Sequence, residues 1–210
     1  MADDQRLRDL MRETRIHLDD LIYPIFVEEE LEDWQRFGVE GHVRARHPWL
    51  PYHEFLTENL ARIVGAKSTE VVAMNTLTVN LHLMMVSFYR PTRERFKILI
   101  ESGAFSSDQY AVASQADFHS RQVGFDPKQA VVELRPRDGE DCLRDEDILA
   151  AIEREGPQLA LVLIGNVNYL TGQAFDMKAI SAKARSVGAS VGFDLAHGAG
   201  SLELSLHDCA

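Results

Sequence analysis

The sequence predicts an α/β fold with a largely parallel sheet and flanking helices, and three observations predict it. From Pro51 onward, short apolar, β-branched runs alternate with stretches long enough for amphipathic helices. Glycines follow several of the helical stretches, namely Gly65, Gly156 and Gly188. Polar residues come directly after the apolar runs. Such alternation is typical of βαβ units, in which successive strands run parallel.

Up to residue 134, predicted helices and strands alternate three times. The first helix is stopped by Gly65 and the second ends before Pro91. The helices are expected at 51–64, 78–89 and 107–121, and the strands at 70–74 (EVVAM), 96–100 and 130–134.

Beyond residue 134 the order repeats. Asp145 is a good N-cap for a helix over 146–155, which Gly156 and Pro157 end. The apolar run QLALVLI over 158–164 then predicts a buried strand. A helix over 177–187, closed by Gly188, and a strand over 190–193 complete the pattern.

The segments that directly follow the strands are the candidate site. In open α/β sheets, ligands bind outside the carboxyl ends of the strands. Four segments therefore carry the functional expectations: Asn75–Thr78, Phe105–Asp108, Gly165–Asn168 and Asp194–His197.

Each of these segments has a chemical interpretation and a structural one. Thr78 opens a helix, where free N–H groups and its hydroxyl suit a phosphate, or it is simply an N-cap. Phe105 suits stacking on a flat heteroaromatic ring, or it is a core residue beside the capping Asp108. Asp194 needs a cationic partner, either a protonated pyridine nitrogen or an Arg. His197 pairs with Asp194 if a helix begins there, or is structural.

Composition excludes several classes of function. The chain has 22 Lys and Arg against 33 Asp and Glu, a net charge of -11, which would repel nucleic acid. Its apolar runs fall far short of the roughly 20 residues of a membrane helix. Met1 leads into charged residues and not into a signal peptide, so a cytoplasmic protein is expected.

Other motifs carry little weight. Cys142 and Cys209 show no ligand spacing and are expected to be reduced. The spacing of His42, His47 and His53 fits no metal site, so none is expected. The glycines of 192–200 do not open a clean strand-to-helix turn and make a poor dinucleotide site.

Longer segments resemble kynureninase. The similarity is most specific in MNTLTVNLHLMMVSFYRPT (74–92) and VGFDLAHGAGSLELSLHD (191–208). It extends through KILIESGAFSSDQYA (97–111), LRDEDILAAIE (143–153) and ALVLIGNVNYLTGQAFDM (160–177). Upstream it includes VEEELEDWQRFGVEGH with HPWL (27–50), so most of residues 27–208 take part.

The resemblance implies a fold and an activity. Kynureninases are fold-type I enzymes that use pyridoxal 5'-phosphate to hydrolyse L-kynurenine to anthranilate and L-alanine, usually as homodimers. Residues 30–210 are then expected to form part of the large, cofactor-binding domain, without its C-terminal strands or the small domain. The expected partners are a small-molecule substrate and a second subunit in the intact family.

The resemblance also implies roles for residues. Leu77 and Thr78 would contact the cofactor phosphate region, Phe105 would stack on the pyridine ring, and Asp108 would sit beside it. The family's match to Asp194 pairs with the pyridine nitrogen.

Two histidines complete these implied roles. His197 would support the cofactor pocket, and His42 matches a residue near the substrate.

The chain departs from the family in one decisive respect. The family's Schiff-base lysine lies roughly two dozen residues past the Asp194 motif, and the sequence stops at Ala210. No lysine of the chain matches that motif, so no catalytic residue is assigned and this chain alone is expected to be inactive. Gly165 also replaces a hydroxyl residue, and Leu170 a tyrosine, of the family's phosphate region.

The N-terminus has a different resemblance. RLRDLMRETRIHLDDLIYPIFVEE (6–29) is similar to the N-terminal arm of porphobilinogen synthase, but includes none of that enzyme's catalytic lysines or metal ligands. We expect residues 1–29 to be an arm foreign to the kynureninase pattern.

Three interpretations stay open at this point. The first is a kynureninase-type hydrolase, and the second is a non-catalytic, truncated fragment or a partner subunit of an intact homologue. The third is another fold-type I activity, such as a desulfurase or an aminotransferase, which needs Asp194 but not the segments TVNLHL and FSSD.

Overall fold

The computed structural model of the chain describes residues 40–209, which fall into two compact units divided between Tyr52 and His53. The first unit contains the short helix α3 (Gly41–Arg44), whose Gly41 lies so close to Trp49 that a Cβ there would approach the indole ring to 2.9 Å. The arm expected over residues 1–29 lies outside the described residues.

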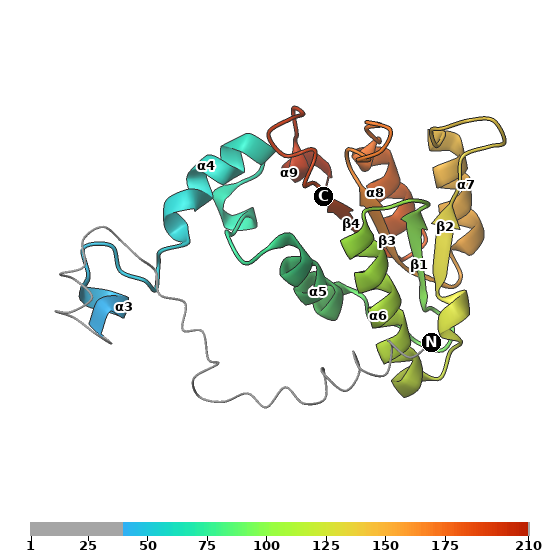
Figure 1. Cartoon of the computed structure of the whole chain (residues 1–210), viewed down its shortest axis with the longest axis horizontal. Helices are drawn as coiled ribbons and strands as arrows, with labels where there is room; N and C mark the ends of the chain where they lie inside the picture. Colours follow the sequence, from blue (N-terminus) through green and yellow to red (C-terminus); the bar gives the residue numbers. More distant parts are fainter. Residues whose placement is uncertain (1–39, 210) are drawn as a thin grey trace, which may run out of the picture. The chain divides into compact units, whose positions relative to one another are not determined.

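The second unit contains a parallel sheet, as the sequence predicts. Within residues 53–209, four strands pair in the order β2–β1–β3–β4, all parallel (Figure 1). Their bounds are β1 Lys97–Glu101, β2 Val131–Leu134, β3 Leu159–Gly165 and β4 Ser190–Asp194. Each lies within a residue of its predicted position.

Helices cover both faces of this sheet. Helices α5 (Leu77–Phe88) and α6 (Ser106–Val123) pack on one face, and α7 (Asp145–Glu155) and α8 (Met177–Ser186) on the other. The strand side chains alternate between these layers, as the period of a strand requires. Ile98, Ile100, Leu161 and Leu163 face α5 and α6, whereas Leu99, Val162 and Ile164 face α7 and α8.

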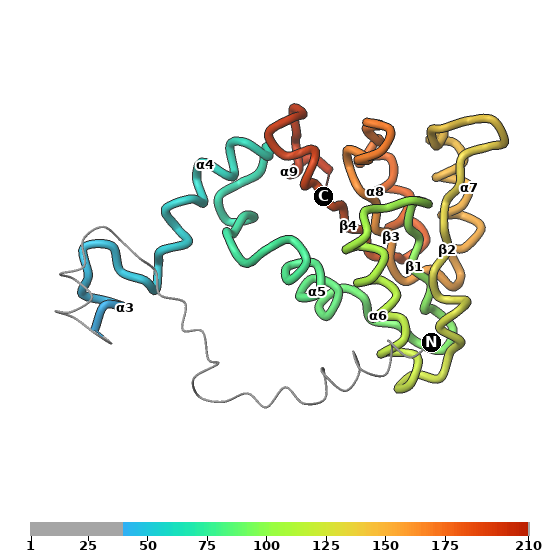
Figure 2. Tube along the Cα trace, in the orientation of Figure 1, coloured from blue at the N-terminus to red at the C-terminus, as the bar shows by residue number. Residues whose placement is uncertain are grey.

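The connections place a crevice between β1 and β3. From β1 the chain leaves through α6 on one face, and from β3 it leaves through α8 on the other, a path that Figure 2 traces. Two neighbouring strands whose connections depart to opposite faces define a topological switch point, where ligands bind in open α/β sheets. The candidate site is therefore expected at the carboxyl ends of these two strands.

The remaining elements are short or lie before the sheet. They are α4 (Glu54–Val64), the 3₁₀ helices η3 (Ser68–Glu70) and η4 (Pro127–Gln129), and α9 (Leu206–Cys209). None of the helices in the described part of the chain is long and apolar enough to cross a bilayer.

The strand predicted over 70–74 is wrong. Residues 71–74 form no strand, and Val72 and Met74 are 53% and 48% exposed. The β-branched composition of EVVAM favours an extended chain, but a strand also needs a neighbour to pair with, and this segment pairs with none of the described strands.

The predicted N-cap of α7 is also wrong. Arg144 occupies the cap position without a side-chain hydrogen bond, and Asp145 is already the first helical residue. A capping aspartate does occur at α8, where the Asp176 side chain accepts a hydrogen bond from the Ala179 amide at 2.9 Å.

Candidate functional site

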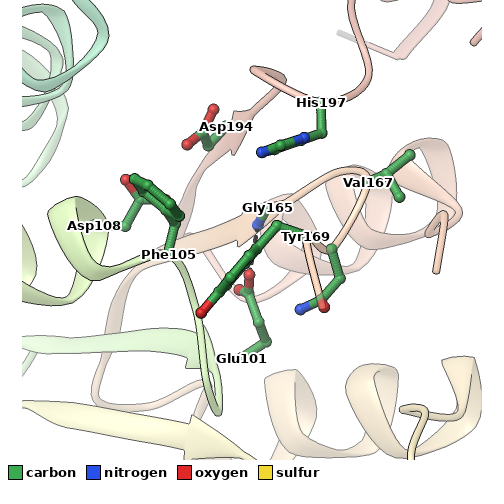
Figure 3. Close-up of a pocket in the computed structure, with 9 residues that line it drawn as sticks. Glu101, Phe105, Asp108, Gly165, Val167, Tyr169, Asp194 and His197 are labelled. Atoms are coloured by element: carbon green, nitrogen blue, oxygen red, sulfur yellow. Dashed lines mark hydrogen bonds between the residues drawn. The ribbon is translucent and has the colours of Figure 1, made fainter. Parts of the chain in front are cut away.

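A cavity lies at the carboxyl ends of β1, β3 and β4, as the switch point predicts. The cavity itself has room for little more than one water molecule, about 10 Å³, and it opens to solvent. Figure 3 shows the residues that line it. The lining comes from the strand ends, the start of α6 and the loops that follow β3 and β4. These residues are Glu101, Phe105, Asp108, Gly165, Val167, Asn168, Tyr169, Asp194 and His197.

Aromatic rings form one part of the lining. Phe105 is the N-cap residue of α6 and is 43% exposed, so its ring is available to a ligand. Tyr169 lies edge-on to Phe105, with ring centroids 5.3 Å apart. The His197 ring lies 6.5 Å from that of Tyr169, at a tilt of 31°. This arrangement suits a flat aromatic guest.

Three carboxyl groups, those of Glu101, Asp108 and Asp194, also line the cavity. Asp108 is only 3% exposed and accepts a hydrogen bond from the Ser107 hydroxyl at 3.2 Å. Burial, and next the charge of Asp194, raise the pKa of Asp108 to about 7. Asp194 ends β4, and its Oδ1 accepts from the Ala196 amide at 2.8 Å.

No positively charged Lys or Arg side chain accompanies these acids in the described lining of the cavity. Nor do the acids form a metal-binding cluster, since no such group of His, Cys, Asp or Glu occurs within residues 40–209. A cavity of this kind suits a ligand that is positively charged on one edge.

Two buried asparagines shape the loop after β3. The backbone N–H of Asn166 donates to the backbone carbonyl of Asp194 at 2.8 Å. The side-chain oxygen of Asn166 accepts from the backbone N–H of Phe175 at 2.8 Å. The Asn168 side chain accepts from the backbone amides two and three residues later, forming a tight turn. Together these bonds hold Tyr169 beside the cavity.

The structure brings together four of the six residues to which the sequence assigned a cofactor role. Phe105, Asp108, Asp194 and His197 all line the cavity. No helix begins at Asp194, where the chain forms turns, so the condition for a helical Asp–His pair is not met.

The other expected site residues lie elsewhere. Leu77 and Thr78 begin α5, where the N-cap residue Thr76 makes no side-chain hydrogen bond, and they do not line the cavity. His42 lies in α3, in the first compact unit, with its ring 4.9 Å from Trp49.

Sequence reasoning missed Glu101 and Tyr169. The predicted strand ended at residue 100, but the candidate segment after it began only at Phe105, and the segment after the strand predicted over 158–164 ended at Asn168, one residue before Tyr169. In the structure Glu101 is the last residue of β1. The signal was present in KILIE, because an acid that ends a buried apolar strand is unusual.

Solved structures share this architecture at low sequence identity. SspA in complex with cysteine matches 86% of this chain and 50% of its own, with a TM-score of 0.61 and 19% identity. A C-DES variant with glycine covalently linked to its PLP cofactor matches 97% and 44%, with a TM-score of 0.58 and 13% identity. An alanine–glyoxylate aminotransferase from Nostoc sp. matches 75% and 38%, with a TM-score of 0.54 and 15% identity. The fold is thus that of part of a fold-type I domain.

Sequence comparison gives the family. No family model matches the chain. Kynureninase from Myxococcus xanthus is 67% identical over 183 residues, and that from Koribacter versatilis is 62% identical over 183 residues. Over those residues the chain is similar to kynureninases. The alignments cover 87% of this chain but only 42% of either relative's length.

Proposed function

We propose that the cavity binds the ring of pyridoxal 5'-phosphate, with the Asp194 carboxylate facing the ring nitrogen. The observation that carries this proposal is the combination of an aromatic lining with the Asp194 carboxylate and no Lys or Arg among the described lining residues. A pyridine ring protonated on nitrogen would supply the missing positive charge. When bound, this cofactor supplies a ring that accepts electrons from a substrate carbon.

The other residues would then orient the cofactor. Phe105 is exposed on the cavity side and would stack on the ring, while Asp108 and His197 would flank it. Leu77 and Thr78 would bind the phosphate, because free N–H groups at the start of α5 suit an anion. The body from residue 30 to 210 is proposed as part of the cofactor-binding domain.

We further propose kynureninase-type hydrolysis of L-kynurenine to anthranilate and L-alanine as the activity of the family protein. The support is the 67% and 62% identity to kynureninases, although the chain spans less than half of their length. His42 is proposed to lie near the substrate. A homodimer and a cytoplasmic location also remain predictions.

The second candidate function is a non-catalytic role. For these 210 residues taken alone, the positions of the lysines favour it. The chain has five lysines, at positions 67, 97, 128, 178 and 183, and none lines the cavity. Lys97 starts β1, at the end of that strand away from the cavity, and is paired with Glu155 at 2.7 Å. The chain would then hold the cofactor without a covalent bond.

The test is a binding and turnover experiment on the purified chain. We expect pyridoxal 5'-phosphate to bind but to be removed by dialysis, with no lysine-linked cofactor after borohydride reduction and no anthranilate from kynurenine. Retention of the cofactor after reduction, together with anthranilate release, would overturn the non-catalytic candidate. Failure to bind at all would overturn the cofactor assignment.

Asp194→Asn tests the central contact. Removing the charge should weaken cofactor binding about 10- to 100-fold, as measured by quenching of protein fluorescence. Asp117→Asn is the matched control, since Asp117 lies on the exposed side of α6 and pairs with Arg121. Equal affinities for the two variants would contradict the role of Asp194.

A further inference from the structure

Glu101 is a buried acid for which the proposed function has no use. Its side chain ends β1 beneath the cavity, and the residue is 3% exposed. Oε1 accepts a hydrogen bond from the Gly165 amide at 3.0 Å, which Figure 3 marks with a dashed line. Oε2 is buried as well and has no hydrogen-bond partner in the described part of the chain.

We infer that Glu101 is a positioning residue of the site, which fixes the end of β3 through Oε1 and offers a hydrogen-bond donor to the cavity's occupant through a protonated Oε2. This inference rests on the proposed function for the identity of that occupant. The geometry supports it in two ways: Glu101 lines the cavity, and an unpaired buried oxygen costs free energy until it finds a partner.

The surrounding charges favour the protonated acid. Burial is the largest influence and raises the pKa of Glu101, and the charge of Asp194 raises it further, whereas hydrogen bonds from the backbone amides of Glu101 and Gly165 lower it. The other titratable side chains that line the cavity are Asp108, Tyr169 and His197. With two further carboxyl groups in the same lining and no Lys or Arg there, a third negative charge on Glu101 would be uncompensated.

The backbone of β3 is adapted to this carboxyl group. A Cβ at Gly165 would lie 2.8 Å from Glu101 Oε1, so a side chain there would require the Glu101 carboxyl group to shift. Glycine at 165 therefore makes room for the side chain, and Glu101 fills the space next to the strand end. The two residues form one unit of the cavity floor.

Infrared spectroscopy on the free chain tests the protonation. The difference spectrum of wild type minus Glu101→Gln should contain the carbonyl band of a protonated carboxylic acid at neutral pH. Glu133→Gln is the matched control, because Glu133 also lies on a strand but is exposed and paired with Arg135. The control should lack this band, and its absence from the Glu101→Gln spectrum would overturn the inference.

Cofactor affinity tests the positioning role. Glu101→Met removes both hydrogen bonds and should weaken pyridoxal 5'-phosphate binding about tenfold, whereas Glu101→Gln, which can still accept and donate, should recover most of that loss. Unchanged affinity in a folded Glu101→Met variant would overturn the role, and so would equal losses in both variants. If wild type binds no cofactor while the infrared band is present, the proposed cofactor fails but the neutral acid stands.

Discussion

Asp108 makes the stability of the chain depend on pH. Its pKa rises from the model-compound value of 3.8 to about 7 in the folded chain, mainly because the side chain is buried. Because the pKa of Asp108 is higher in the folded chain than in the unfolded chain, the protonated acid stabilises the fold at pH values below the pKa of the unfolded chain. This contribution to stability is lost as the pH rises through the pKa of the folded chain. Wild type should therefore lose stability between about pH 4 and pH 7.

Asp108→Asn should remove this loss. Relative to wild type, the variant should gain on the order of 4 kcal/mol of unfolding free energy across that pH window. Urea unfolding at several pH values would measure the gain, with Asp117→Asn as the exposed control on the same helix. A variant whose pH profile runs parallel to that of wild type would show that Asp108 is ionised throughout.

At the residue scale, the site was largely predictable. Phe105, Asp108 and His197 follow strands and Asp194 ends one, and strand ends converge on one edge of a parallel sheet. The position of Glu101 at a strand end was visible in the sequence, but its hydrogen bond to Gly165 across the sheet was not. Sequence spacing does not report such a contact.

At the scale of elements, helix capping gives a paired prediction. Asp176→Ala should cost about 1 kcal/mol of unfolding free energy, because the Asp176 side chain caps α8. Asp145→Ala should cost only about 0.3 kcal/mol, since Asp145 makes no cap bond and merely lies in the first turn of α7. Chemical denaturation of both variants measures the difference, and a larger cost at Asp145 would restore the sequence-based assignment.

The turn after α4 gives another prediction. Gly65 has φ of 63°, and a Cβ there would lie 2.1 Å from the Leu204 carbonyl oxygen. Gly65→Ala should cost about 3 kcal/mol, from backbone strain plus this collision. Gly139→Ala is the matched control, with φ of 81° but open space around the site, and should cost about 1 kcal/mol. Thermal unfolding measures the loss of stability in both variants. Equal losses for Gly65→Ala and Gly139→Ala would show that the contact with Leu204 is unimportant.

The elements were predicted well where pattern and pairing agree. Strands β1 and β3 are buried on both faces, so their continuous apolar runs identified them. The segment 70–74 has the same composition but no partner strand among the described residues, and composition cannot supply one. The cap of α7 was predicted wrongly because Asp145 and Arg144 are adjacent. A shift of one residue in the start of the helix decides which of them is the cap.

At the scale of the whole molecule, the order of the strands was beyond the reach of the pattern. Alternating elements predict a parallel sheet, but not that β1 lies between β2 and β3. That order creates the crevice, because it sends α6 and α8 to opposite faces. The division between Tyr52 and His53 was likewise unmarked in the sequence by any linker-like composition.

The same strand order divides the cavity between two continuous stretches of sequence. Glu101, Phe105 and Asp108 precede the exposed loop around Gly139, whereas Gly165, Tyr169, Asp194 and His197 all follow it. A Cβ at Gly139 would meet nothing within 4 Å, and breaks in such loop tips are well tolerated. A cut at this loop would therefore leave two polar side chains of the lining, Glu101 and Asp108, on one piece and the remaining polar lining residues on the other.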